Sequence, residues 1–259
     1  MDGITTHDPA AVDSLDPEVA HYTVKRVSGE TVDPRADAIN SVACFGDTAT
    51  GRAEPDRLAV DADGDRASSA RREFDWNWLC PTDEGYRDRI HDCVDRCVAA
   101  SPDVRLLTVG FPGEGFCRCE RCTALFDASE HEERTDWRAA VITEFVEDVA
   151  DRVPGEFVLT AHPDPYPGHL RARRGLDLAR LDEVVDGFLV PLCDPEYATT
   201  YWLETIARGF STAVESPVTV QLSSTPSAKE RFEAAAHAVA PHVERVVAGG
   251  TRETLEPVW

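Results

Sequence analysis

The pattern of apolar and polar positions along the 259-residue chain predicts strands that alternate with helices. Short runs of valine, leucine and isoleucine are bounded by glycine, proline and aspartate. Continuous runs of this kind are typical of parallel strands that are buried on both faces. Eight runs qualify as candidate strands: residues 21–27, 40–45, 57–61, 104–111, 156–162, 187–192, 218–222 and 245–248.

The segments between the later strands have the periodicity of helices. Apolar side chains recur every three or four positions over residues 83–100 and again over 135–153. Each segment would therefore bury one face of a helix against the sheet. Shorter helices are expected over residues 176–185, 199–208 and 227–240.

The alternation of strand and helix predicts a parallel sheet with right-handed crossovers. A closed (β/α)8 barrel and an open doubly wound sheet both satisfy this pattern. The chain length is close to the ~250 residues typical of a barrel, and no G-x-G-x-x-G fingerprint follows the first strand, so we favour the barrel. Residues 46–80 are rich in aspartate, glycine and arginine and lack a clear helix. We therefore expect a barrel that is distorted or incomplete in its N-terminal third.

The composition along the chain predicts a short N-terminal arm and one domain. Residues 1–20 are polar and contain Pro9 and Pro17, so they are expected to form a flexible N-terminal arm. Residues 21–259 show no break in composition and no repeat at solenoid spacing, which favours a single barrel domain.

The charge is strongly negative. There are 48 acidic residues against 26 basic ones, and only Lys25 and Lys229 are lysines. Dispersed carboxylates with little lysine keep a surface hydrated in concentrated salt, so we interpret the chain as a cytoplasmic protein of a salt-accumulating halophile. A merely acidic mesophilic protein is the alternative. The negative charge argues against nucleic acid or an anionic membrane as partner. Neither a transmembrane run nor a secretory signal is expected.

The sharpest local signal is a C-x-C-x-x-C motif at residues 117–122. Three thiols so close together can face one ion, and Zn²⁺ favours thiolates in a tetrahedron. The fourth ligand must come from elsewhere; Cys80 is the first choice, ahead of His131 and His91. The predicted metal ligands are Cys80, Cys117, Cys119 and Cys122.

Other interpretations of the cysteines remain. The motif could be three unmetallated thiols, whereas its spacing matches neither ferredoxin pattern for an iron–sulfur cluster. Cys93 and Cys97 lie on the apolar face of the helix predicted over residues 83–100, so core packing is expected for both. Cys44 and Cys193 stand at strand ends, and their role is left open.

Catalytic residues of parallel barrels lie where strands end at the carboxyl side. Glu114 stands between two glycines directly after the strand predicted over residues 104–111, a position suited to a general acid. Asp164, Asp194 and Glu196 follow later strands and are candidates for the second carboxylate of a catalytic pair. Alternatively, Glu114 caps the cysteine loop or pairs with Arg118.

Aromatic residues supply candidate substrate contacts. Trp76 and Trp78 are close enough in sequence to line a sugar-stacking pocket, although they would equally well seal the core. His162, Tyr166 and Tyr197 follow predicted strands and are expected near the mouth of the barrel.

The stretch Trp78-Leu79-Cys80-Pro81-Thr82, followed by a helix, a strand and the C-x-C-x-x-C motif, resembles glycoside-hydrolase-like TIM-barrel proteins with such a loop after a central strand. The likeness covers roughly residues 57 to 250. It implies a carbohydrate substrate and a catalytic carboxylate pair. Many of these barrels carry an aspartate within the fourth strand; here residues 107–111 contain no acid, and Glu114 would have to replace it.

Three functional hypotheses follow. The first is a carbohydrate-active, glycoside-hydrolase-like enzyme in which Glu114 and a second carboxylate act on a small-molecule or oligosaccharide ligand, with a zinc-stapled loop. The second is a non-catalytic, zinc-stabilised carbohydrate-binding or scaffold barrel. The third is a metal enzyme that uses His162, Asp164 or Asp194 as ligands, and it ranks last because the chain lacks H-E-x-x-H. The oligomeric state is left open.

Overall fold

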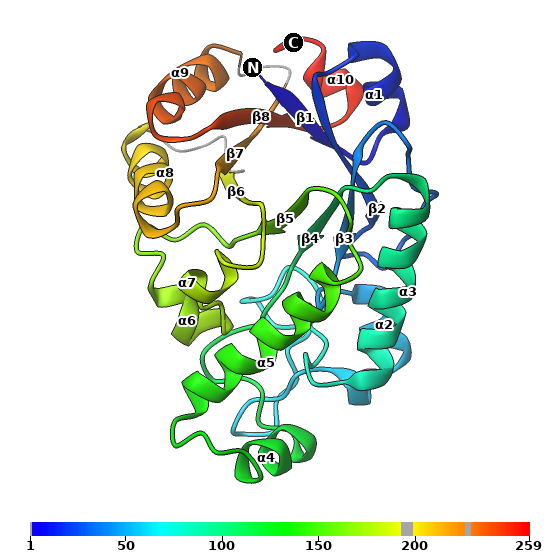
Figure 1. Cartoon of the computed structure of the whole chain (residues 1–259), viewed down its shortest axis with the longest axis vertical. Coiled ribbons are helices and arrows are strands. Elements are labelled where there is room, and N and C mark those ends of the chain that lie inside the picture. The colour runs from blue at the N-terminus through cyan, green and yellow to red at the C-terminus, as the bar shows by residue number, and fades with distance from the viewer. Residues whose placement is uncertain (1, 193–198, 226–228) are drawn as a thin grey trace.

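The computed structural model describes residues 2–192, 199–225 and 229–259, and over these residues eight parallel strands close into a barrel in sequence order (Figure 1). The predicted (β/α)8 class is therefore confirmed. The barrel closes where β1 pairs with β8, with Gly3 opposite Val247. The strands are β1 (Gly3–Thr6), β2 (Val19–Lys25), β3 (Ile39–Ala43), β4 (Val104–Leu107), β5 (Phe157–Thr160), β6 (Gly187–Leu192), β7 (Val218–Ser223) and β8 (Arg245–Gly249).

Helices cover the outside of the barrel (Figure 1). The two longest, α3 and α5, have the apolar faces that the sequence predicts. None of the described helices is long and apolar enough to cross a membrane. The helices are α1 (Pro9–Leu15), α2 (Thr48–Ala53), η1 (Pro55–Arg57), α3 (Glu84–Ala100), α4 (Glu120–Asp127), α5 (Arg134–Ala150), α6 (His169–Arg174), α7 (Leu178–Leu181), α8 (Tyr201–Ala213), α9 (Lys229–Val239), η2 (Ala240–His242) and α10 (Arg252–Leu255).

The flexible arm predicted over residues 1–20 is wrong. Residues 3–6 form β1, which is buried and pairs with both β2 and β8. Helix α1 follows at once, because Asp8 caps it by accepting the Ala10 amide and Pro9 suits the first helical turn. Ile4 is the only large apolar residue of β1, so the strand carries too little hydrophobic pattern to be recognised in isolation.

The strand predicted over residues 57–61 is also wrong. Leu58 and Val60 make only isolated antiparallel bridges, to Leu79 and Arg66 respectively. The sequence predicts that the irregular residues 46–80 leave the barrel distorted or incomplete, but the barrel is closed. These residues form a long excursion between β3 and α3. In Figure 1 this excursion is the cyan trace between α2 and α4.

A buried ion pair joins this excursion to the barrel. Lys25, at the end of β2, lies 3.0 Å from the Asp47 carboxylate, and both side chains are almost fully buried. The Lys25 ammonium also donates to the carbonyl of Ala43 (3.0 Å) and contacts the Tyr86 hydroxyl (3.1 Å). The Tyr86 hydroxyl in turn donates to Asp47 at 2.9 Å. One of the two lysines of the chain therefore holds β2, the start of α2 and α3 together.

Candidate functional site

A cavity of about 430 Å³ opens at the carboxyl end of the barrel strands. Its floor comes from the ends of β4 and β5, and one wall comes from residues 73–78 of the long excursion. This is the end of a parallel barrel where ligands bind. Residues that line it include Phe74, Trp76, Trp78, Thr108, His162 and Arg174.

The aromatic wall of this cavity consists of Phe74, Trp76 and Trp78. The two indole rings lie 5.8 Å apart between centroids. Phe74 contacts Phe116 edge to face at 5.7 Å, so the loop after β4 lies against the wall. A Cβ at Gly46 would come within 2.7 Å of the Trp76 indole nitrogen, and only glycine therefore leaves room for this ring. Trp78 is 6% exposed and packs in the core, as the alternative interpretation expects, whereas Trp76 is half-buried; both line the cavity, and stacking on a sugar stays a prediction.

Two polar groups of the cavity-lining residues have no protein partner within the part of the chain that the structure describes. They are the indole N–H of Trp76 and the hydroxyl of Thr160, and both are buried. Buried polar groups are normally hydrogen-bonded, and leaving one unpaired costs roughly 1–3 kcal/mol.

Arg174 and His162 also line the cavity, and Arg174 lies against the aromatic wall. Arg174 donates to the carbonyls of Phe111 (3.2 Å) and Pro112 (2.7 Å), and its guanidinium lies 5.0 Å from the Trp78 ring centroid. Burial lowers the pKa of Arg174 to about 10, so it stays charged at neutral pH. His162 is accessible from the cavity, yet desolvation, followed by the charge of Arg174, lowers its pKa to about 4. Its neutral imidazole offers one donor and one acceptor.

The carboxylates predicted as catalytic have different surroundings. Glu114 is exposed on the loop after β4, outside the residues that line the cavity. Its carbonyl, like that of Gly113, accepts a hydrogen bond from Arg138, which fixes the loop backbone. Asp164 is buried and accepts from the Tyr166 amide at 2.8 Å and from Arg173 at 2.6 Å. Its carboxylate therefore orders the loop after β5.

None of the four remaining predicted site residues is among the described residues that line the cavity, whereas two acidic residues that were not predicted are. Tyr166 is 65% exposed and contacts His169 rather than the cavity. Asp194, Glu196 and Tyr197 lie outside the described residues. The carboxylates that do line the cavity are Glu73 and Asp75, which the sequence reasoning missed although they flank the aromatic stretch. Glu73 pairs with Arg71 at 2.6 Å, whereas Asp75 is exposed.

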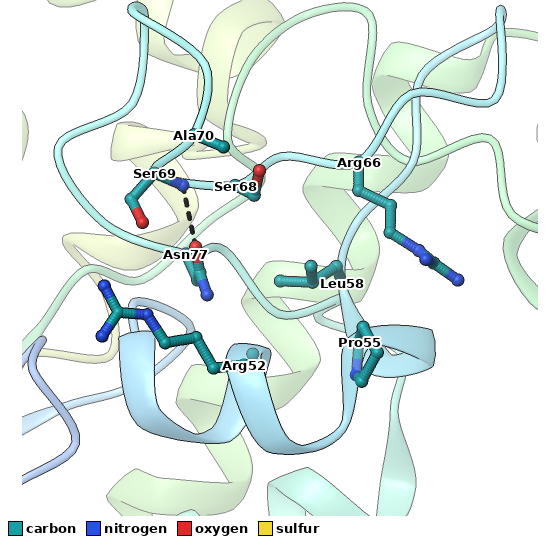
Figure 2. Close-up of a pocket in the computed structure, with 9 residues that line it drawn as sticks. Arg52, Pro55, Leu58, Arg66, Ser68, Ser69, Ala70 and Asn77 are labelled. Atoms are coloured by element: carbon teal, nitrogen blue, oxygen red, sulfur yellow. Dashed lines mark hydrogen bonds between the residues drawn. The ribbon is translucent and has the colours of Figure 1, made fainter.

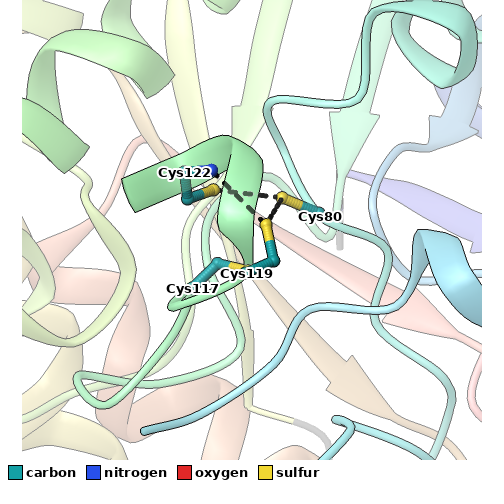
Figure 3. Close-up of side chains that lie close together, drawn as sticks. All are labelled: Cys80, Cys117, Cys119 and Cys122. Atoms are coloured by element: carbon teal, nitrogen blue, oxygen red, sulfur yellow. Dashed lines mark hydrogen bonds between the residues drawn. The ribbon is translucent and has the colours of Figure 1, made fainter. Parts of the chain in front are cut away.

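The four predicted metal ligands come together in the structure (Figure 3). Their sulfur atoms all lie within 4.8 Å of one another, and none forms a disulfide. The Cys80 sulfur is 3.3 Å from that of Cys122 and 3.9 Å from that of Cys119. Zinc–sulfur bonds of about 2.3 Å in a tetrahedron separate the sulfurs by about 3.8 Å, so the arrangement fits one tetrahedral ion. Cys80 is the fourth residue of the cluster, and its role as fourth ligand stays a prediction; His91 instead stacks on Phe145.

The cysteine cluster connects three separate segments. Cys119 caps the first turn of α4 by accepting the Cys122 amide, and Cys80 precedes α3. The Cys117 sulfur accepts the Val60 amide at 3.3 Å. Hydrogen bonds from the neighbouring thiols, first of all Cys117, lower the pKa of Cys80 to about 7 and that of Cys119 much further. The same network raises the pKa values of Cys117, chiefly through Cys119, and of Cys122, chiefly through Cys117. Thiolates are the form that binds metal.

The remaining described cysteines are part of the core. Cys93 and Cys97 are buried on the inner face of α3, as predicted, and Cys44 is buried at the end of β3. Cys193 lies outside the described residues.

A second, more open pocket of about 480 Å³ lies between α2, η1 and residues 66–70 (Figure 2). Asn77 organises it by accepting the Ser69 amide at 2.7 Å and donating to the Thr48 carbonyl at 3.2 Å. Arg66, which lines it, already pairs with Asp56 at 2.6 Å. This pocket lies away from the strand ends, and its hydrogen bonds stabilise the excursion.

Comparisons with known proteins support the fold. No family model matches the chain, and no curated protein matches it. The glycoside hydrolase domain of PgaB (BpsB) from Bordetella bronchiseptica superposes with a TM-score of 0.63 at 8% identity, over 85% of this chain and 71% of that one. Bacillus subtilis mannanase BCman gives 0.48 at 10% identity, over 97% and 80%. A hypothetical protein from Ruminiclostridium thermocellum gives 0.45 at 14% identity, over 64% and 98%. The likeness to the PgaB domain is a likeness of fold.

Proposed function

We propose that this chain is a carbohydrate-active barrel of the glycoside-hydrolase type, which binds an oligosaccharide in the cavity at the carboxyl end of its strands. The observation that carries the proposal is the wall of Phe74, Trp76 and Trp78, which lines the cavity together with Thr160; the Trp76 N–H and the Thr160 hydroxyl have no protein partner among the described residues. Ligand pockets combine aromatic surface with a few placed polar groups, and sugars offer apolar ring faces together with hydroxyls. The barrel shared with a glycoside hydrolase domain is consistent with this assignment.

The proposal includes a structural zinc ion held by the four cysteines. All four positions of a tetrahedron would be filled by thiolates, so no position stays open for substrate. The ion would clamp the loop after β4 to the excursion that carries the aromatic wall. Its role is then to hold the cavity in shape.

Cleavage of a glycosidic bond requires a general acid and a second carboxylate. Glu114 remains the proposed acid, because its loop lies against the aromatic wall through the Phe116–Phe74 contact. Asp75 is the proposed partner, since it lines the cavity beside Phe74 and has no ion pair among the described residues. Asp164 is already engaged by Arg173, and Asp194 and Glu196 stay as predicted alternatives.

Binding tests the proposal first. Replacing Trp76 by alanine should weaken the bound oligosaccharide about 10-fold or more, because a large stacking surface at the centre of the site is lost. Isothermal titration with a panel of neutral and acidic oligosaccharides would measure it. Trp259→Ala, which removes a tryptophan from the C-terminus, is the matched control and should bind as the parent does. Equal affinity of the Trp76 variant, or no binding by the parent to any member, would refute the proposal.

Turnover tests the carboxylates. Glu114→Gln and Asp75→Asn should each lower the rate of glycosidic cleavage by about 100-fold or more, since general acid–base catalysis contributes about that much. Reducing-end release from the best-bound oligosaccharide measures it, with Glu132→Gln, an exposed glutamate of the loop before α5, as the control. A parent chain that binds sugar and never cleaves it establishes the non-catalytic binding barrel instead. Undiminished cleavage by either variant removes that residue from the mechanism.

A further inference from the structure

The guanidinium of Arg174 carries a charge that no carboxylate balances within the described part of the chain. Both of its protein hydrogen bonds go to neutral carbonyl oxygens, and the surface beneath it is the Trp78 ring. The neighbouring arginines differ. Arg173 pairs with Asp164, and Arg171 pairs with Asp136. This contrast sits in a chain with 48 acidic and 26 basic residues, so a shortage of carboxylates does not explain it.

Leaving a half-buried charge unpaired costs free energy. Burial lowers the pKa of Arg174, and the like charge of Arg173 adds to the effect. The group is nevertheless held firmly in place. The Arg174 carbonyl accepts the Phe111 amide at 2.9 Å, and Gly110, at φ +120°, packs so closely that a Cβ would lie 2.7 Å from that carbonyl oxygen. A fixed, charged guanidinium without a carboxylate partner is well suited to bind an anionic group of a ligand in the cavity.

The other charges around the cavity leave the Arg174 side positive. His162 is neutral at physiological pH, and Arg173 is paired with Asp164. Glu73 shares the Arg71 guanidinium with Asp61, so a negative charge remains there, and Asp75 belongs to the aromatic wall. The cavity therefore has one acidic rim, over residues 73–75, and one cationic side at Arg174.

We infer that the sugar bound in this cavity carries an anionic substituent, a ring carboxylate of the uronic acid type, which binds the Arg174 guanidinium. This inference rests on the proposed function. Both protein hydrogen bonds of the guanidinium use Nη1, which leaves the Nε and Nη2 edge for a carboxylate. Two parallel N–H···O bonds from that edge match carboxylate geometry. Stacking on Trp78 fixes the plane of the guanidinium while the Trp76 ring is left for the sugar.

The test compares three probes in one buffer by isothermal titration: an oligogalacturonide, the same oligosaccharide as its methyl ester, and a sulfated galactose oligosaccharide. We expect the acid to bind the parent chain about 30-fold more tightly than the ester, equivalent to about 2 kcal/mol. Arg174→Gln should remove this preference, so that the acid and the ester bind the variant with equal affinity, whereas Arg174→Lys should restore part of it, because the charge returns without the planar fork.

The outcomes distinguish a failure of the inference about the anionic substituent from a failure of the proposed oligosaccharide binding. Equal affinities of the parent chain for acid and ester overturn the inference without any variant, and so does an acid preference that survives Arg174→Gln. If the ester still binds and Trp76→Ala still weakens it, the proposed function stands alone. If no sugar of any kind binds, both fail. Preference for the sulfated probe over the carboxylate overturns the assignment to a uronic acid.

Discussion

Serine in place of Cys80 is expected to abolish zinc binding and to lower the melting temperature by on the order of 10 °C. Structural zinc contributes about 10–16 kcal/mol to small zinc-finger peptides, and here part of that coupling stabilises one corner of a larger barrel. A loss of several kcal/mol corresponds to such a shift in a chain of this size. Elemental analysis of the purified protein should find about one zinc per chain in the parent and none in the variant.

The contacts of the cluster extend this expectation to the cavity. In the sequence, the aromatic wall lies between two residues that contact the cluster. Val60 donates its amide to the Cys117 sulfur, and Cys80 is itself a member of the cluster. The carbonyl of Val60 also accepts the Arg118 amide at 2.7 Å. Loss of the ion should therefore free both loops, and chelation of the parent protein should weaken oligosaccharide binding together with stability.

Cys93→Ser is the control for this variant. Cys93 is a buried cysteine of α3 that lies outside the cluster, so its replacement perturbs packing and leaves the metal in place. Zinc content should then separate the two serine variants completely. A parent protein that contains another metal with visible charge-transfer bands, such as iron, would contradict zinc. Full zinc in the Cys80 variant would contradict the ligand set.

Replacement of Lys25 by methionine is expected to destabilise the fold by about 3–5 kcal/mol, because it leaves the Asp47 carboxylate buried without its counter-charge. Asp47 is 2% exposed, and its other contacts, from Thr50 and Tyr86, are hydrogen bonds. Chemical denaturation followed by tryptophan fluorescence gives the free energy of unfolding. The other lysine of the chain supplies the control. Lys229 is exposed, and its single ion pair, with Glu233, is long at 3.9 Å and therefore weak. Lys229→Met should change stability by no more than about 0.5 kcal/mol.

The pH dependence gives this prediction a second readout. Burial by itself would raise the pKa of Asp47, but the charge of Lys25 and the hydrogen bonds lower it overall. A carboxylate with a lowered pKa in the folded state stabilises the fold above its unfolded pKa of about 3.9, and that stabilisation disappears as the pH falls through the folded value. The parent should therefore lose stability in this acid range, and Lys25→Met should lose less. Equal destabilisation by the two lysine variants would show that the buried pair contributes nothing.

Local patterns in the sequence were enough for the later barrel and for most of the cysteine cluster. Residues 187–192 are a continuous apolar run and form β6 over the same bounds, because a strand buried on both faces carries its signal in every residue. The apolar face of α3 is equally local. The C-x-C-x-x-C spacing brings three thiols together within six residues, and the fold adds Cys80 to them.

Only the tertiary structure decided which polar groups meet. Ile4 gives β1 almost no pattern of its own, and the strand exists because β2 and β8 pair with both of its edges. Asp164 could not be distinguished from a catalytic acid until Arg173 of the following helix was seen to pair with it. Arg174 likewise reaches Trp78 from a distant part of the chain. Hydrophobic periodicity reports burial residue by residue, whereas an ion pair or an unpaired charge depends on partners that the fold brings from far along the chain, and no local pattern encodes them.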